Sequence, residues 1–222
     1  MIKSKKIAII CGVLICATAI GGFFYGKEQK RQQIKDLPVI ENMATYPAYT
    51  LEQLTDEATY IVEATVSKVK DSRMEKVDAY YIDEAGKKVD CPSYFPITPI
   101  VLEVKQVIKG EMSSKRITYY EEGGVTETQI ELPPGIAMRE GMELIFFLNE
   151  NGYGLGGGQG LFPVYGDAVK VTSVLAEYVD GLLVKTINSD EIKSDIWSME
   201  ANKDINVMDK EDFVSMVYDL MK

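Results

Sequence analysis

Residues 142–165 read MELIFFLNENGYGLGGGQGLFPVY, which combines an apolar run, a turn signal and a glycine-rich return. The segment Met142 to Asn149, in which Leu144 to Leu148 are all apolar, predicts a buried strand. Asn151-Gly152 follows and is the strongest short hairpin signal in the chain, because a two-residue turn of this type needs positive φ at both positions. The second apolar segment, Leu161 to Tyr165, predicts the return strand.

The glycines of this stretch also match a dinucleotide-binding pattern, Gly152-x-Gly154-x-x-Gly157. That chemistry needs a helix directly after the glycines, and the following sequence, 159–163 (QGLFP), does not favour one. We therefore expect no nucleotide and assign the glycines to turns, bulges or close backbone approach. The functional hypothesis that remains is a binding loop lined by Tyr153, Gln159 and Phe162.

Other segments also predict strands. In 60–69, Val62, Ala64 and Val66 alternate with polar residues, which predicts a half-buried strand. In Ile100 to Ile108 the alternation slips near Gln106, which predicts a β-bulge. Three prolines between 92 and 99 argue against a regular element before Ile100. Further strands are expected at 116–121, as a polar edge strand at 125–132, and around an Asp180-Gly181 hairpin turn.

Two helices are expected near the ends of the β region. Thr50 and Gln53 form a capping-box pattern that opens a short helix. Asp209 caps a final helix over 210–221, whose apolar residues fall on one face. Short antiparallel strands with terminal helices predict a mainly β domain, a small OB-like antiparallel barrel with flanking helices. Tyr80-Tyr81 and Tyr94-Phe95, in a hairpin insertion, predict either an exposed aromatic patch or buried packing.

The N-terminal part predicts a membrane segment. Ile7 to Gly26 is an uncharged run of 20 residues with lysines on both sides, long enough to cross a bilayer. We expect an anchor at 1–26, a juxtamembrane linker at 27–49 and an extracytoplasmic domain at 50–222. The alternative is a signal cleaved after Ala17-Thr18-Ala19, which would release a secreted domain.

Charge and composition exclude several functions. Residues 1–35 carry seven basic residues and one acidic residue, whereas residues 36–222 carry 17 and 33. A domain with a net charge of −16 repels nucleic acid, so no nucleic-acid partner is expected. The chain has no histidine, which excludes histidine-based acid–base catalysis and histidine metal sites. Cys91 is the one cysteine beyond the membrane segment, so we expect no metal and no cofactor.

Two acidic patterns are weak candidates for chemistry. Carboxylates are frequent in 121–131, and together with Asp167 they offer the paired groups that a glycosidase uses (Glu121, Glu122, Glu127 and Glu131). An acidic domain places such neighbours on a solvated face without any catalytic role. Asp204-x-Asn206 lacks the glycine and the terminal glutamate of a calcium loop.

The order of segments resembles a known module. Four segments resemble uncharacterised envelope-anchored proteins of Gram-positive bacteria: TLEQLTDEATYIVEATV (50–66), IVLEVKQVIKG (100–110), GMELIFFL (141–148) and QGLF (159–162). Their order is also similar to that of the netrin/TIMP-type module, an OB-like barrel. The resemblance implies an OB-like fold. The N-terminal cysteines that such inhibitors use to reach a protease metal have no counterpart here, so protease inhibition is not implied.

These observations favour a membrane-anchored, extracytoplasmic binding or envelope-associated module of unknown ligand, with a protein of the envelope as a possible partner. The alternatives are a carboxylate-dependent envelope hydrolase and an accessory subunit of a membrane complex.

Overall fold

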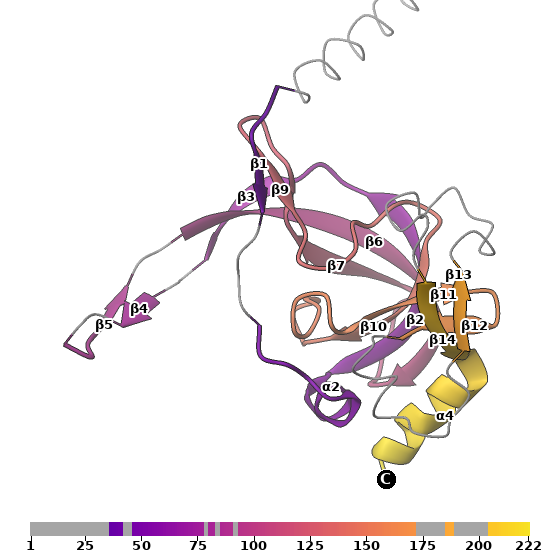
Figure 1. The fold of residues 1–222 in the computed structure, drawn as a ribbon. Coiled ribbons are helices and arrows are strands. Elements are labelled where there is room, and N and C mark those ends of the chain that lie inside the picture. Colours follow the sequence, from indigo (N-terminus) through magenta and orange to yellow (C-terminus); the bar gives the residue numbers. More distant parts are fainter. Residues whose placement is uncertain are drawn as a thin grey trace, which may run out of the picture.

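A computed structural model describes residues 36–41, 46–77, 80–82, 85–90, 93–171, 185–188 and 204–222. The predicted membrane segment, all three cysteines and the predicted Asp180-Gly181 turn lie outside these residues. Among the described residues, no helix has the length and apolar character needed to cross a membrane. The described part of the chain is mainly β, as predicted (Figure 1).

Most strands belong to one large sheet, with the order β13-β14-β12-β11-β10-β2-β6-β3 and with β7 on the other edge of β6. Their bounds are β2 Tyr60–Val69, β3 Arg73–Val77, β6 Ser93–Lys109, β7 Arg116–Glu122, β10 Glu143–Leu148, β11 Leu161–Tyr165, β12 Ala168–Lys170, β13 Lys185–Asn188 and β14 Asp204–Asp209. All pairings within this sheet are antiparallel.

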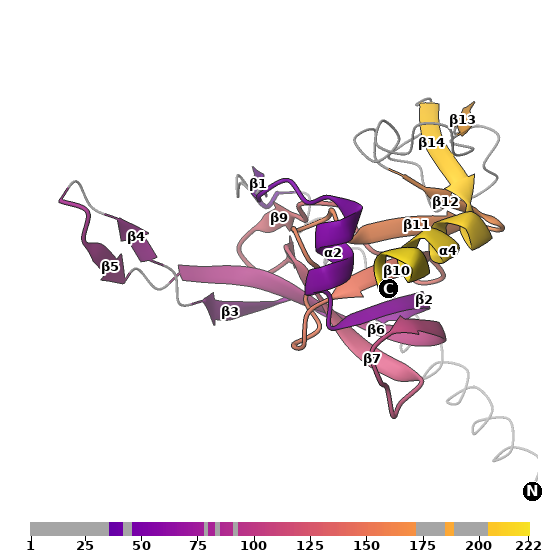
Figure 2. The same cartoon turned by 90° about the horizontal axis from the view of Figure 1, so that it is seen from below.

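Two smaller sheets lie beside it. The first has the order β1-β9-β8, in which β1 is Val39–Glu41, β8 is Gly124–Val125 and β9 is Ile130–Leu132, and β1 runs parallel to β9. The second pairs β4, Tyr80–Ile82, with β5, Lys88–Asp90. The helices are α2, Leu51–Glu57, and α4, Lys210–Leu220. Figure 2 shows β4 and β5 at the far end of an arm that β3 and β6 extend from the body.

Around β2 and β10 the large sheet buries both of its faces. Val62, Ala64 and Val66 of β2 enter one core together with Phe146 of β10, which confirms the predicted alternation. The prediction that the strand is only half-buried is wrong for its first half, because Ile61 and Glu63 on the other face are buried as well. Ile61 faces the opposite core, which α2 and α4 cover. The apolar run of β10 serves both cores, since its successive side chains point to opposite faces. This explains why the run shows no alternation in sequence.

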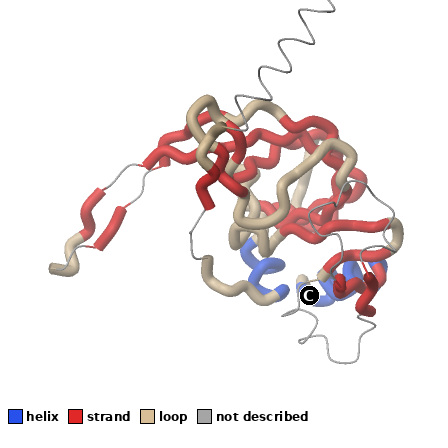
Figure 3. The backbone as a smooth tube through the Cα atoms, turned by 45° about the horizontal axis from the view of Figure 1, so that its top comes forward, coloured by secondary structure: helices blue, strands red, loops and turns tan. Residues whose placement is uncertain are grey.

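The prediction of a closed OB-like barrel is wrong for the described strands, because the sheet does not close on itself: β7 pairs with β6 alone, β10 lies between β11 and β2, and no ladder joins β7 to β10. Isolated bridges from the connection after β10 span this gap, joining Tyr153 to Tyr120 and Gly154 to Leu148. The chain turns away after these bridges, so no continuous ladder forms there. Figure 3 shows that curved strands (red) make up most of the body and that the two helices (blue) lie close together on one side of it.

Strand β6 begins earlier than predicted, at Ser93, and runs through Pro96 and Pro99. A proline has no backbone N–H to donate to a neighbouring strand. The lost hydrogen bond costs little at Pro96, because only β3 pairs with that position. The predicted bulge is confirmed, since Lys105 and Ile108 are extra residues of β6 on either side of Gln106. The predicted edge strand at 125–132 is interrupted by a turn at Thr126, whose N–H donates to the Gln129 carbonyl at 2.9 Å.

Both helix predictions are confirmed. Thr50 and Gln53 exchange the two hydrogen bonds of a capping box, and the Asp209 side chain accepts from Glu211 N and Asp212 N. Helix α4 packs Phe213 against Phe162 of β11, with ring centroids 4.9 Å apart.

Helix α4 also places a basic side chain, Lys210, against the sheet. Lys210 Nζ donates to Glu63 Oε1 at 3.1 Å, and Lys105 pairs with the adjacent Glu143. Glu63 is a polar position of β2 by alternation, yet it is buried under these partners. Burial, together with a hydrogen bond to Glu143, raises the pKa of Glu63.

Candidate functional site

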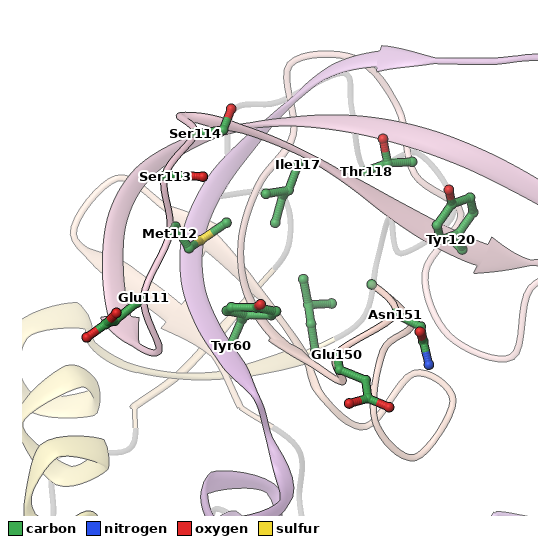
Figure 4. A pocket seen from close by; sticks show the side chains of 12 residues that line it. Tyr60, Glu111, Met112, Ser113, Ser114, Ile117, Thr118, Tyr120, Glu150 and Asn151 are labelled. Carbon is green, nitrogen blue, oxygen red and sulfur yellow. The ribbon is translucent and has the colours of Figure 1, made fainter.

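A cavity of about 370 Å³ opens between the β6–β7 connection and the turn that follows β10 (Figure 4). It lies between the edge strand β7 and the end of β10, which do not pair with each other. Twelve residues line it: Tyr60, Glu111, Met112, Ser113, Ser114, Ile117, Thr118, Tyr120, Leu148, Glu150, Asn151 and Gly152. This volume suits a small molecule or one side chain of a larger ligand.

The β6–β7 connection is held against the start of β2. Gly110 has φ +87°, and a Cβ there would lie 2.6 Å from the Thr59 carbonyl oxygen, so a glycine permits this approach. Ser114 Oγ accepts a hydrogen bond from Arg116 N at 3.0 Å, which fixes the end of the connection. The segment between them presents Met112 and Ser113 to the cavity.

The opposite wall is the turn at 149–152. Asn149 Oδ1 accepts from Asn151 N and Tyr153 N, and Gly152 N donates to the Asn149 carbonyl. Tyr120 N donates to the Gly152 carbonyl at 3.0 Å, which attaches the turn to β7. A turn is present near the predicted position, but the predicted two-residue hairpin is wrong: the Gly152–Asn149 hydrogen bond places Glu150 and Asn151 at the centre of the turn, and residues 149–160 connect β10 to β11. This turn forms one wall of the cavity.

Gly152 lends itself to a matched test. It has φ +85°, and an added Cβ would lie 2.5 Å from the Thr118 carbonyl oxygen, whereas Gly141 has φ +90° and open space around it. Both alanine variants incur the strain of positive φ, about 1–2 kcal/mol. We expect Gly152→Ala to cost about 1 kcal/mol more, because the turn must move from β7. Urea unfolding of both variants measures this excess, and equal losses would contradict it.

An aromatic pair supports the cavity from behind. Tyr120 lines the cavity and stacks on Tyr153, with ring centroids 5.3 Å apart and an interplanar angle of 28°. The Tyr153 hydroxyl donates to Glu75 Oε2 at 3.2 Å, and Glu75 also accepts from Arg73 Nε at 2.8 Å. Burial, followed by the charge of Glu75, raises the pKa of Tyr153. These contacts join the base of the arm to the cavity wall.

The structure does not bring the three predicted site residues together in one cavity. Tyr153 supports the lining residue Tyr120 and is not itself part of the lining. Phe162 is buried between Phe147 and Phe213 in the core, so its ring does not face a surface ligand. Gln159 binds the preceding linker: its Oε1 accepts from Tyr49 N, and its Nε2 donates to the Pro47 carbonyl, each at 2.9 Å.

The glycine-rich loop is a platform for that linker. A Cβ at Gly156 would lie 2.9 Å from the Tyr49 ring, and one at Gly157 would lie 2.8 Å from the Tyr46 ring. The Tyr46 hydroxyl donates to Glu122, which secures the linker to β7. The glycines are therefore needed where the linker's tyrosine rings approach the loop backbone.

The candidate carboxylates are also dispersed. Glu121 is buried and accepts from Met138 N at 3.0 Å, whereas Glu122, the next residue along β7, accepts from Tyr46. Asp167 lies in the turn between β11 and β12, and four strands separate it from β7 in the sheet order. None of these three groups lines the cavity. Within the described ranges, no set of three or more Cys, Asp or Glu side chains is placed to hold a metal ion.

Sequence reasoning missed the segment Glu111 to Ser114, which supplies a third of the cavity lining. Lys109-Gly110 signalled the end of a strand, but no local pattern distinguishes a connection that lines a cavity from one that does not.

No family model, curated protein or solved structure matches this chain. The class that the fold and site define is a mainly β domain with a cavity at the open edge of its sheet.

Proposed function

We propose that this protein is a membrane-anchored, extracytoplasmic binding module, tethered by residues 7–26 and binding its ligand in the cavity beside the open edge of the sheet. The observation that carries the proposal is the cavity itself. Its two walls are fixed to the sheet through Gly110 and Gly152, and this gives it a preformed shape.

Anchoring is supported by the uncharged run of 20 residues and its flanking lysines. The linker that follows is attached to the domain through Tyr46 and Tyr49. A tether fixed at these residues would hold the domain near the bilayer.

Fractionation and a cavity-filling variant test the two parts of this proposal. The full chain is expected in the membrane fraction and open to external protease in intact cells. Recovery in the medium, with an N-terminus after Ala19, would instead show a cleaved signal.

For the cavity, Ser113→Trp is expected to abolish small-fragment binding detected by ligand-observed NMR. Ser67→Trp, an exposed position outside the lining, is the control. Fragment binding that both variants retain would contradict a ligand site here.

The projecting arm favours a second candidate, an accessory subunit of a membrane complex. Tyr94 is 62% exposed, Met74 43% and Phe95 37%, so the exposed alternative for Tyr94-Phe95 is the one observed. β3 and β6 form this part of the arm, and two-stranded ribbons gain little stability on their own in water. Large exposed apolar side chains on such a ribbon are typical of a protein contact.

A photo-crosslinking amino acid at position 94 tests this candidate in intact cells. A membrane protein cross-linked at 94, but not at the exposed control position 127, would support the subunit role. Absence of any adduct at 94 would count against it.

A further inference from the structure

We propose that the ligand of the cavity is an organic cation, an ammonium group carried on a short apolar body. This inference rests on the binding role proposed above for the same cavity. It adds the chemical class of the ligand, which follows from the floor of the cavity, its charge and its surroundings.

The floor of the cavity is apolar. Leu148 is 1% exposed and belongs to the core inside the curved sheet. Tyr60, Met112 and Ile117 pack against the same core and are partly exposed. In Figure 4 Met112 and Ile117 lie next to the Tyr60 ring. An apolar group that enters the cavity removes this surface from water, which favours binding.

The charged groups of the lining are both acidic. Glu111 comes from the β6–β7 connection and Glu150 from the turn after β10, and both side chains are exposed. In the view of Figure 4 the two carboxylates lie apart, on either side of Tyr60 and pointing outward at the rim of the cavity, and the hydroxyls of Ser113 and Thr118 lie on the opposite side. An ammonium group at the mouth of the cavity is attracted by the nearer of these carboxylates, while its apolar body covers the floor.

Basic side chains nearby do not cancel this charge within the lining. Lys109 Nζ donates to the carbonyls of Thr55 and Asp56 at 2.6 and 3.0 Å, at the end of α2. Lys115 and Arg116 follow the lining serines in sequence, but neither lines the cavity. An anionic ligand would meet the two carboxylates without a basic partner in the lining. A neutral polyol would satisfy the hydroxyls and leave the apolar floor poorly covered.

Three probes of equal length separate these possibilities: hexylammonium, 1-hexanol and hexanoate. Binding is followed by ¹H–¹⁵N NMR of the isolated residues 36–222, and of the full chain in detergent micelles to exclude an effect of truncation. We expect hexylammonium to shift the amides of Ser113 and Gly152. We expect 1-hexanol to bind about three- to tenfold more weakly, the range for one or two exposed ion pairs, and hexanoate to bind weakest. The preference is expected to shrink at 0.5 M salt, because exposed charges are screened.

Matched variants test the role of the carboxylates. Glu111→Gln with Glu150→Gln is expected to lower hexylammonium affinity to that of 1-hexanol. Glu103→Gln with Glu127→Gln removes the same charge at exposed positions outside the lining and is expected to retain the preference. Loss of the preference in both double variants would overturn the assignment, because long-range attraction to the acidic domain would then account for it.

The neutral probe separates this inference from the proposed function. If 1-hexanol binds the same amides as tightly as hexylammonium, the cavity remains a ligand site and the cation assignment fails. If no probe shifts these amides, both proposals fail.

N-acetyl-lysine N-methylamide distinguishes the source of the ammonium group. Tighter binding than hexylammonium supports a lysine side chain of a peptide, and weaker binding supports a free amine.

Discussion

Replacing Glu121 with glutamine is expected to stabilise the protein at pH 8 by up to about 3 kcal/mol and to leave its stability nearly unchanged at pH 4. Burial raises the pKa of Glu121 from 4.5 to about 7, and the Met138 N–H that its carboxylate accepts offsets this only in part. A rise of this size corresponds to about 3 kcal/mol of differential interaction between the two protonation states.

The sign follows from proton binding in the two states. Below pH 4.5 the carboxyl is protonated in both folded and unfolded chains and does not penalise folding. Between pH 4.5 and about 7 the unfolded chain releases the proton while the folded protein keeps it, so stability falls as pH rises. Above that window the folded protein contains a buried carboxylate, and the hydrogen bond from Met138 N offsets only part of the cost of its charge. Glutamine keeps this acceptor without the charge.

Urea unfolding at several pH values measures the effect. The difference between wild type and Glu121→Gln is expected to grow from pH 4.5 to 7 and then to level off. Glu127→Gln makes the same charge change at an exposed position and is expected to follow the wild-type curve. Parallel curves for wild type and Glu121→Gln would show that this carboxyl does not titrate in the folded protein as argued.

Truncating Phe213 to alanine is expected to cost about 3–5 kcal/mol, the usual range for a buried phenylalanine. The side chain is fully buried and packs on Phe162, so its loss leaves a cavity between α4 and the sheet. Tyr218→Ala is the control on the same helix, since Tyr218 is 40% exposed. It is expected to cost less than about 1 kcal/mol.

Thermal or urea unfolding compares the two variants, and amide exchange shows whether α4 alone detaches. If α4 folds cooperatively with the sheet, Phe213→Ala lowers protection in β10 and β11 as well as in α4. If protection falls in α4 alone, the helix detaches locally while the sheet stays folded. Equal stability of the two variants would contradict the placement of Phe213 in the shared core.

Elements defined by near neighbours in sequence were predictable. The alternation of Val62, Ala64 and Val66 predicts β2, and the Thr50 capping box predicts the start of α2. The slip near Gln106 predicts a bulge that is present in β6. In each case the signal and the structure involve residues a few positions apart, because strand pleating and helix capping are local.

The candidate site was not predictable in this way. Phe162 looked like a lining residue because a glycine run precedes it, but a helix about 50 positions later in the sequence covers its ring. Glu63 is polar by alternation, but Lys210 reaches it from 147 positions away. The cavity combines β2, the β6–β7 connection and the turn after β10, and no local pattern links these three segments.

The sequence by itself determined the mainly β character, the capped helices and the separation of a basic N-terminal segment from an acidic domain, because these depend on local periodicity and composition. It also indicated a turn near Asn151-Gly152, but not the long connection in which that turn lies. Only the tertiary structure decided what the glycine-rich stretch does. Gln159 meets Pro47 from 112 positions away, and Gly156 and Gly157 leave room for the Tyr49 and Tyr46 rings. Such contacts depend on which surfaces meet after the sheet has formed. For this reason one stretch contains a buried strand, a cavity wall and a docking platform for the linker.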